Sequence, residues 1–267
     1  MALTIGRAPF THPPGGTYNF DLQRLAPEHI LYLEDVPKRI RGVLAGETIL
    51  DTRRGKMLHE TAEFIQWYVP LEDIRTGVLE PSDKRASDRF KGEATFYHVH
   101  VGERSERDAA WSYDQPPQGA SALRGGVAFD FDRLDAWFEE DDQIFGHPRD
   151  PYHRFDCRRT SEHIVVRVGG ETIAETHRAI KLFETGIPPR YYIPLDDVKG
   201  EALAPSETRT LCPYKGEATY YTVRGGASTE TDGAWTLPDP YGEAIAVLGH
   251  VSFWGDKTEI EADGKRT

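Results

Sequence analysis

Residues 91–97 read KGEATFY, and residues 215–221 read KGEATYY. The same offset of 124 positions relates three further pairs of segments: GETIL from Gly46 to GETIA from Gly170, PLED from Pro70 to PLDD from Pro194, and VAF from Val127 to VSF from Val251. A constant offset without a gap indicates a tandem duplication, because chance similarity would drift in register. The period is much longer than that of solenoid or propeller repeats, so we predict two copies of one domain.

The duplication divides the 267 residues into four segments. We expect an N-terminal arm over residues 1–29, a first domain (repeat 1) over 30–142, a linker over 143–156 and a second domain (repeat 2) over 157–267. Each repeat has the usual size of a domain with a single core. We expect the two repeats to pack as an intramolecular pseudo-dimer, so that the protein is a monomer or a homodimer of such units.

Short alternating runs of apolar and polar residues predict β-strands in both repeats. Residues 163–168 (HIVVRV) and 171–176 (ETIAET) flank Gly169-Gly170, which predicts a two-residue hairpin. Repeat 1 has Ala45-Gly46 there, for which we expect a different turn type. Only residues 133–142 (RLDAWFEEDD) fit a longer amphipathic helix. The fold class is therefore mainly β, with two small antiparallel domains whose sheets are closed or folded over.

The composition disfavours several classes of partner. Asp and Glu number 44 against 32 Lys and Arg, and an acidic chain is a poor match for a nucleic-acid backbone. No segment approaches the roughly 20 apolar residues of a membrane helix, and the first residues do not resemble a secretory signal. Two cysteines are too few for a disulfide framework or a four-thiolate zinc site. We predict a cytoplasmic protein without a cofactor, whose partner is neither nucleic acid nor membrane.

Three motifs of repeat 2 carry a family resemblance: FETGIPPRYYIPLDDV from Phe183, CPYKGEATYY from Cys212 and AWTLPDP from Ala234. They resemble the bacterial family called domain of unknown function 427, and the linker HPRDPYHR (residues 147–154) resembles that of its two-domain members. The resemblance covers almost the whole chain and implies a fold of the Mss4-like or β-tent type. Repeat 1 departs from these motifs, with His59 for Phe183, Phe64-Ile65 for Pro188-Pro189, Gln66 for Arg190, Trp67 for Tyr191 and Asp88 for Cys212.

The family carries a nucleotidyltransferase label, which the residues do not support. The chain has no glycine-rich phosphate loop leading into a helix, and no paired-aspartate motif that would hold Mg²⁺ against a triphosphate. Asp196 and Asp197 are adjacent, so on a strand they would face opposite sides. Nucleotidyl transfer is therefore not predicted.

Candidate catalytic residues cluster in repeat 2. Glu184 and Lys215 have counterparts in repeat 1, and such a pair can transfer protons or form a salt bridge between strands. Cys212 lies close to Lys215 in sequence, and an ammonium can lower the pKa of a thiol; alternatively Cys212 is a half-buried residue at a strand end. His250 and the linker residue His153 are further candidates for proton transfer near neutral pH.

Candidate binding residues are aromatic, cationic or part of the linker. Alternate residues of a strand face opposite sides, so one tyrosine of each pair, 191–192 and 220–221, is expected in the core and the other in a pocket. Arg190 could anchor an anionic group. The two prolines of the linker predict an ordered segment that contributes to the pocket wall. The candidates, each of which could instead be structural, are Arg190, Tyr192, Tyr221, Trp235, His147, Asp150 and Tyr152.

His98 and His100 are two residues apart, which places both imidazoles on one face of a strand. That spacing can chelate a metal, but repeat 2 has Thr222 and Arg224 at these positions. Two exposed histidines are the commoner explanation, and we predict no metal site.

Two functional hypotheses follow from the sequence. The first is a small-molecule enzyme or ligand-binding protein of unknown reaction, with its pocket in repeat 2 and at the linker. The second is a non-catalytic module for ligand binding or interaction, in which the same residues only anchor the ligand.

Overall fold

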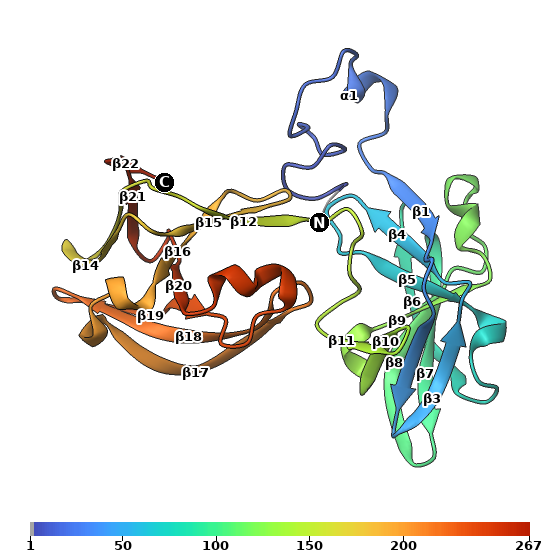
Figure 1. The fold of residues 1–267 in the computed structure, drawn as a ribbon. Coiled ribbons are helices and arrows are strands. Elements are labelled where there is room, and N and C mark those ends of the chain that lie inside the picture. The colour runs from blue at the N-terminus through green and yellow to red at the C-terminus, as the bar shows by residue number, and fades with distance from the viewer. Residues whose placement is uncertain (1–2) are drawn as a thin grey trace. The chain divides into compact units, whose positions relative to one another are not determined.

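The computed structural model describes residues 3–267 and forms two compact units, residues 1–152 and 153–267. Each unit contains one repeat, and an arm with one short helix, α1 (Leu22–Leu25), precedes repeat 1 (Figure 1). Antiparallel strands and short 3-10 helices make up both repeats, which confirms the predicted fold class. No helix within residues 3–267 is long and apolar enough to cross a membrane.

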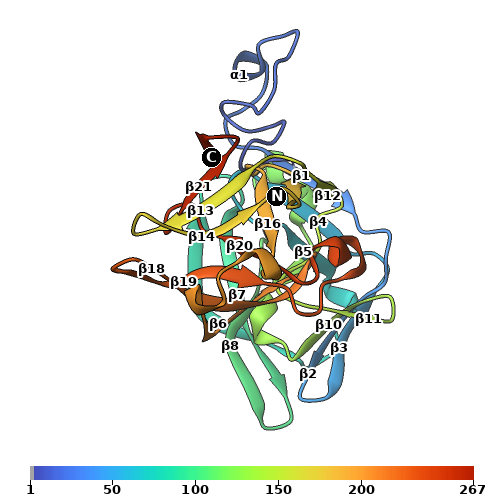
Figure 2. The same ribbon diagram turned by 60° about the vertical axis from the view of Figure 1, so that its left-hand side comes forward.

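Repeat 1 consists of a seven-stranded and a four-stranded sheet. The larger sheet has the order β1 (Leu31–Asp35), β4 (Lys56–Glu60), β5 (Gln66–Pro70), β9 (Gly126–Phe129), β8 (Arg104–Ser112), β7 (Gly92–Val101) and β6 (Leu79–Asp88). The smaller has the order β11 (Asp142–Ile144), β10 (Ala136–Glu139), β2 (Ile40–Leu44) and β3 (Glu47–Thr52). The 3-10 helices are η1 (Leu71–Asp73), η2 (Gln118–Leu123) and η3 (Phe131–Arg133). The β7–β8 hairpin projects beyond the other strands of this repeat (Figure 2).

Repeat 2 has the same topology. Its larger sheet has the order β12 (Phe155–Arg159), β15 (Ile180–Glu184), β16 (Arg190–Pro194), β20 (His250–Phe253), β19 (Ser228–Thr236), β18 (Gly216–Gly225) and β17 (Leu203–Cys212). The smaller consists of β22 (Lys265–Arg266), β21 (Glu259–Ala262), β13 (Ile164–Val168) and β14 (Glu171–Thr176). The 3-10 helices are η4 (Leu195–Asp197), η5 (Gly200–Ala202) and η6 (Gly242–Val247).

Each seven-stranded sheet has an apolar core on both faces. In repeat 1, Trp67 of β5 packs toward the four-stranded sheet, while the next residue, Tyr68, packs on the opposite face, where η2 lies. In repeat 2, Tyr191 and Tyr192 divide between the two cores in the same way, and both are buried. Successive side chains of a strand point to opposite faces of the sheet, so one continuous apolar run contributes residues to both cores.

The hairpin turns of the two repeats have the same backbone conformation, contrary to the expectation of different turn types. The φ angles are +51° and +76° at Ala45-Gly46, and +56° and +79° at Gly169-Gly170. The pairing of the two strands shifts its register at the equivalent point in both hairpins. The strand pairing therefore determines the backbone conformation of the turn. The left-handed conformation costs Ala45 about 1–2 kcal/mol.

Residues 133–142 do not form the helix that their pattern suggested. η3 ends at Arg133, and β10 pairs with β2. Burial alternates along β10, with Trp137 and Glu139 buried. The burial pattern therefore repeats every two residues, as in a strand, rather than every 3.6 residues, as in a helix.

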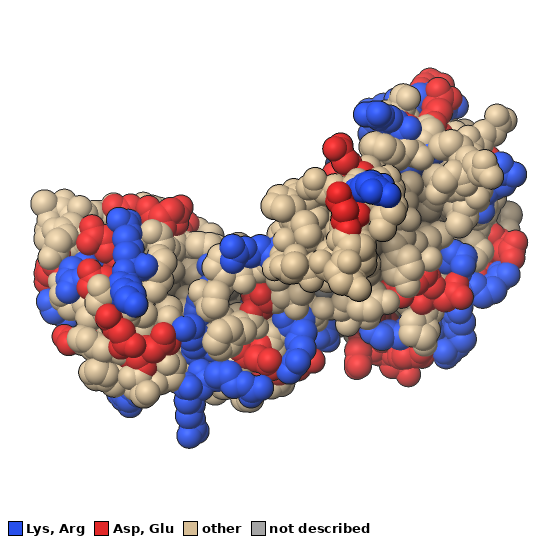
Figure 3. All heavy atoms as spheres, turned by 90° about the horizontal axis from the view of Figure 1, so that it is seen from above, with Lys and Arg blue, Asp and Glu red and all other residues tan. Residues whose placement is uncertain are grey.

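Charged side chains of both signs are interspersed on the face drawn in Figure 3. Many of them form ion pairs, such as Arg39 with Asp51 and Arg178 with Asp197. Exposed pairs of this kind each contribute little to stability.

Candidate functional site

A chain of three polar side chains ties together distant parts of repeat 1. His29 Nε2 lies 2.8 Å from Glu60 Oε1, and the Lys91 ammonium donates a hydrogen bond to Glu60 Oε2. His29 precedes β1, Glu60 ends β4, and Lys91 lies in the turn between β6 and β7. The side chains of Glu60 and Lys91 are only 7% and 11% exposed, so the pair is shielded from water. We call these residues the repeat 1 triad.

The equivalent residues of repeat 2, each 124 positions later, form the same arrangement. His153 Nε2 lies 3.0 Å from Glu184 Oε1, and the Lys215 ammonium donates to both oxygens of Glu184, at 2.7 and 2.6 Å. The structure therefore brings together three of the five predicted catalytic residues. We call His153, Glu184 and Lys215 the repeat 2 triad.

An aromatic ring covers the histidine of each triad. Phe90 stacks on His29 with ring centroids 3.8 Å apart, and its counterpart Tyr214 lies 4.3 Å from His153. The duplication thus extends upstream to His29, which the sequence analysis missed. Pro27 and Pro151 are also 124 positions apart, so a Pro-x-His pattern at the constant offset carries the signal in the sequence.

The triads show that the seven-stranded sheets curl. In repeat 1, β4 and β7 are four steps apart in strand order, a separation of roughly 19 Å in a flat sheet. Lys91, just before β7, nevertheless contacts Glu60 at the end of β4. The larger sheet therefore folds over the face that carries the triad.

The glycine of the KGEAT motif shapes the turn that presents the lysine. Its φ is +91° at Gly92 and +99° at Gly216, a conformation that favours glycine. A Cβ atom at Gly216 would also lie 3.0 Å from the carbonyl oxygen of Asp239. The motif recurs because both repeats need this turn to position the lysine.

The residue three positions before the lysine differs between the repeats. Asp88 Oδ1 accepts the backbone N–H of Lys91 at 2.8 Å, and Asp88 Oδ2 lies 3.2 Å from the Lys91 ammonium. Repeat 2 has Cys212 here, and the Lys215 ammonium is directed to Glu184. Within the described residues, no hydrogen bond joins Lys215 to the thiol that we expected it to activate.

A cavity of about 360 Å³, the repeat 1 cavity, opens beside the repeat 1 triad. Its charged lining residues are Glu60, Glu63, Asp88 and Lys91, so three carboxylates face one ammonium. Its aromatic lining residues are Phe64, Tyr68, Phe96, Trp111 and Tyr113.

The surroundings of Glu184 and Lys91 keep these two groups charged. Burial raises the pKa of Glu184, but hydrogen bonds and charge interactions with His153 and Lys215 outweigh it and lower the pKa to about 2. Burial lowers the pKa of Lys91, but the hydrogen bond and charge of Glu60 outweigh it and raise the pKa above its ordinary value. At neutral pH Glu184 is therefore an anion and Lys91 a cation.

In repeat 2, predicted binding residues pack on one another near the counterpart of the repeat 1 cavity. The Arg190 guanidinium lies over the rings of Trp235 and Trp254, at 5.2 and 4.6 Å from their centroids. Trp235 Nε1 donates a hydrogen bond to the Tyr192 hydroxyl at 3.2 Å. The Arg190 guanidinium is thus stacked on indoles, and its role as an anion anchor stays a prediction. Trp254 was missed because repeat 1 has Asp130 at that position.

The structure corrects the assignment of Tyr221 to the pocket. Tyr220 packs with the core on the triad's face of the sheet, and Tyr221 packs with the core on the opposite face. Because alternate strand residues face opposite sides, Tyr220 is the equivalent of the cavity residue Phe96. His250 lines a different cavity, described below.

Three predicted linker residues belong to the first unit and pack against repeat 1. The contacts are His147 with Phe64 (5.2 Å between ring centroids), Asp150 Oδ2 with His59 Nδ1 (3.9 Å) and the Tyr152 hydroxyl with Glu34 (2.8 Å). The linker is ordered, but no linker residue lines either cavity described here. His153, at the end of the linker, contacts Glu184 in the repeat 2 triad, and the contribution of the linker to a pocket wall in repeat 2 stays a prediction.

His98 and His100 each contact a group close by in repeat 1. His98 Nδ1 accepts the backbone N–H of Asp108 at 3.0 Å, and His100 Nε2 lies 2.7 Å from Glu80 Oε2. Within residues 3–267, no group of three or more His, Cys, Asp or Glu is placed to hold a metal ion.

A family model described as a domain of unknown function (DUF427) matches the chain twice, over residues 32–140 and 156–264. One match falls in each compact unit. No curated protein matches the chain.

Proposed function

The chain belongs to the DUF427 family in two tandem copies, and from that premise we propose that repeat 1 binds a small aromatic molecule bearing a positive charge or N–H donors. The ligand occupies the repeat 1 cavity. The observation that carries the proposal is the lining of this cavity, in which five aromatic side chains surround a polar end with three carboxylates and one ammonium.

The size and walls of the cavity support a planar ligand. A volume of about 360 Å³ falls at the lower end of the range for small-molecule sites. Tyr68 and Tyr113 are buried, while Phe96 and Trp111 are half-buried. The Lys84 ammonium lies over the Phe96 ring, 4.1 Å from its centroid. Aromatic faces attract both planar rings and cations.

The charges at the polar end favour a cation over an anion. Lys91 is already paired with Glu60 and Asp88, which leaves little of its charge for a ligand. Glu63 is exposed at the surface and adds a third carboxylate to the lining. An anionic ligand would meet net repulsion, whereas a donor group can bind the carboxylates.

The triads support binding rather than catalysis. A general base is most effective when its pKa lies near the working pH, and a carboxylate with a pKa of about 2 is a weak base. A lysine whose pKa is raised stays protonated and is not a nucleophile. Glu184 and Lys91 therefore act as fixed charges. The partner we propose is a small molecule.

Three ligands of equal size test the proposal: benzamidine (cationic), benzamide (neutral) and benzoate (anionic). Isothermal titration at low ionic strength should give affinities in the order benzamidine, benzamide, benzoate. Charge reversal in Glu63→Lys should lower the affinity for benzamidine by about tenfold, equivalent to about 1.4 kcal/mol of binding free energy. Glu93→Lys is the control, because Glu93 is exposed and adjoins the lining residue Ala94 without lining the cavity.

Equal affinity for the three ligands, or tightest binding of benzoate, would contradict the proposal. Equal losses in Glu63→Lys and Glu93→Lys would also contradict it, because they would indicate attraction to the overall negative charge.

A further inference from the structure

We infer that repeat 2 carries a second site, which binds the phosphate or carboxylate group of a small molecule through Arg159 and His250. The site is a cavity of about 920 Å³, the repeat 2 groove, bordered by β12, β15, β16, β20 and η6. It is separate from the repeat 1 cavity and does not depend on the function proposed for it.

The duplication shows what changed at this place. In repeat 1, Asp35 of β1 pairs across the strands with Lys56 of β4, and their side chains form an ion pair at 2.6 Å. At the equivalent positions of repeat 2, Arg159 pairs with Ile180. Where repeat 1 has a neutralised pair, repeat 2 therefore has a single cation opposite an apolar residue.

Arg159 has no carboxylate partner among the residues that the structure describes. Its neighbour Arg158, on the other side of the strand, lies 3.5 Å from Asp156 Oδ1. Arg159 lines the cavity opposite an isoleucine. Its guanidinium therefore keeps hydrogen-bond donors available to an oxyanion.

A histidine lines the same place in repeat 2 and has no counterpart in repeat 1. His250, at the start of β20, takes the position of Gly126 in repeat 1, and both Arg159 and His250 line the groove. His250 Nδ1 lies 2.9 Å from the Leu248 carbonyl oxygen, which can only accept, so Nδ1 carries a proton. Nε2 is then the nitrogen that donates to an anion when the ring is protonated.

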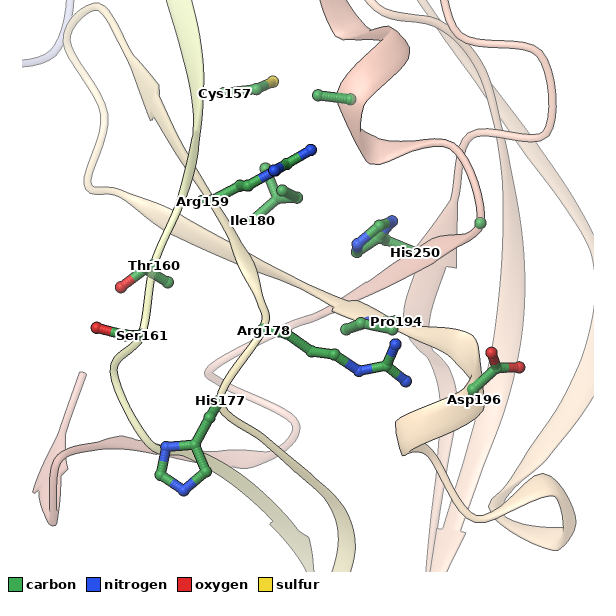
Figure 4. A pocket seen from close by; sticks show the side chains of 12 residues that line it. Cys157, Arg159, Thr160, Ser161, His177, Arg178, Ile180, Pro194, Asp196 and His250 are labelled. Atoms are coloured by element: carbon green, nitrogen blue, oxygen red, sulfur yellow. The ribbon is translucent and has the colours of Figure 1, made fainter.

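The other charged groups of the lining leave this end cationic. Arg178 is held by Asp197 through hydrogen bonds of 2.9 and 2.7 Å. Figure 4 shows Arg159 and His250 pointing into the same space, while Asp196 lies beyond Arg178. The anion is therefore placed at the end defined by Arg159, His250 and Cys157.

Cys157 provides a reporter for occupancy. Its thiol is half-buried on the groove lining, and burial raises its pKa. Alkylation of the intact protein by iodoacetamide is carried out at about pH 6.5, where an imidazole is partly protonated. Peptide mass spectrometry gives its rate, with Cys212 as the internal reference. A bound anion that covers the thiol slows the reaction by the factor 1 + [L]/Kd, which is about tenfold at ten times Kd.

The probes are inorganic phosphate and succinate, each compared with sodium chloride of equal ionic strength. We expect one or both probes to protect Cys157 selectively. Protection by phosphate alone identifies phosphate esters as the ligand class. Protection by succinate alone identifies carboxylates as the ligand class. Arg159→Asp, which restores the residue type of repeat 1, should abolish the protection, and Arg158→Ala should retain it. Circular dichroism of each variant verifies folding.

Lack of protection by both probes would overturn the inference. Equal loss of Cys157 protection in Arg158→Ala and Arg159→Asp would also overturn it. So would protection of Cys212 to the same extent as Cys157. If Arg159→Asp fails to fold, Arg159→Gln applies the same test without a charge reversal.

Discussion

Glu184 is buried between a histidine and a lysine, and its two oxygens accept hydrogen bonds from both. A buried carboxylate in these surroundings is stabilised as an anion, because desolvation is offset by direct partners. Glu60 has the same neighbours in repeat 1, so the arrangement survived the divergence that replaced Cys212 by Asp88 and Arg190 by Gln66.

The lowered pKa of Glu184 makes stability depend on pH. The folded value of about 2 lies below the ordinary 4.5, so the stabilisation is complete above about pH 4.5 and is lost as the pH falls toward 2. Its upper limit is about 3 kcal/mol. Urea unfolding of the protein and of Glu184→Gln should therefore differ by a constant amount near neutral pH and converge in acid.

Glu217→Gln is the control for this experiment, because Glu217 is exposed on β18, two residues after Lys215. A difference between the protein and Glu184→Gln that stayed constant down to pH 2 would contradict the assigned pKa.

All three residues of the repeat 2 triad were predicted from the sequence, together with the repeat 1 counterparts of Glu184 and Lys215. Glu184 and Lys215 were found because both repeat at the 124-residue offset. His29 and His153 repeat at the same offset within a Pro-x-His pattern, but they lie upstream of the segments that defined the repeats, so His29 was assigned to the arm. Tyr221 was chosen over Tyr220 because alternation fixes which residues share a face, but not which face is the functional one.

At the scale of elements, the lysine turn depends on its glycine. Gly216→Ala introduces a side chain at φ +99° and 3.0 Å from the Asp239 carbonyl oxygen. Strain of this kind costs about 1–3 kcal/mol. We expect lower stability of repeat 2 in urea, with faster hydrogen exchange in peptides of β17 and β18.

Gly242→Ala is the matched control, because a Cβ atom there meets nothing within 4 Å and its φ is not positive. An unchanged exchange rate in Gly216→Ala would show that the turn adapts and that the motif's glycine has another role.

The strands themselves were largely predictable, since period-two patterns and the Gly169-Gly170 signal identify them. The error at residues 133–142 came from a short segment in which charged residues mask the alternation. The indole of Trp137 decided the outcome, because burial in the core required pairing of β10 with β2.

At the scale of the whole molecule, the repeats share topology and triads but differ in the charge of their cavities. The repeat 1 cavity has an excess of carboxylates, and the repeat 2 groove has an unpaired arginine. The sequence predicted the duplication from its constant offset. It could not predict this divergence, which depends on cross-strand pairs such as Asp35 with Lys56.

The linker offers a prediction at this scale. Residues 147–152 belong to the first unit, where Asp150 is buried and Tyr152 bonds to Glu34. Replacement of these six residues by glycine and serine should therefore destabilise repeat 1 and leave the exchange rates of repeat 2 unchanged. Unchanged rates in both repeats would indicate a passive tether.

The central claim is that the repeat 1 cavity is a binding site for cationic or N–H-donating aromatic molecules. The most direct measurement is a crystal structure of the protein with the tightest ligand from a screen of aromatic amines, amidines and acids. We predict an amine or amidine, with its ring against Tyr68, Phe96 or Trp111 and its donor group facing Glu60, Glu63 or Asp88. An acid as the tightest ligand, or a ligand bound elsewhere with this cavity holding only water, would contradict the claim.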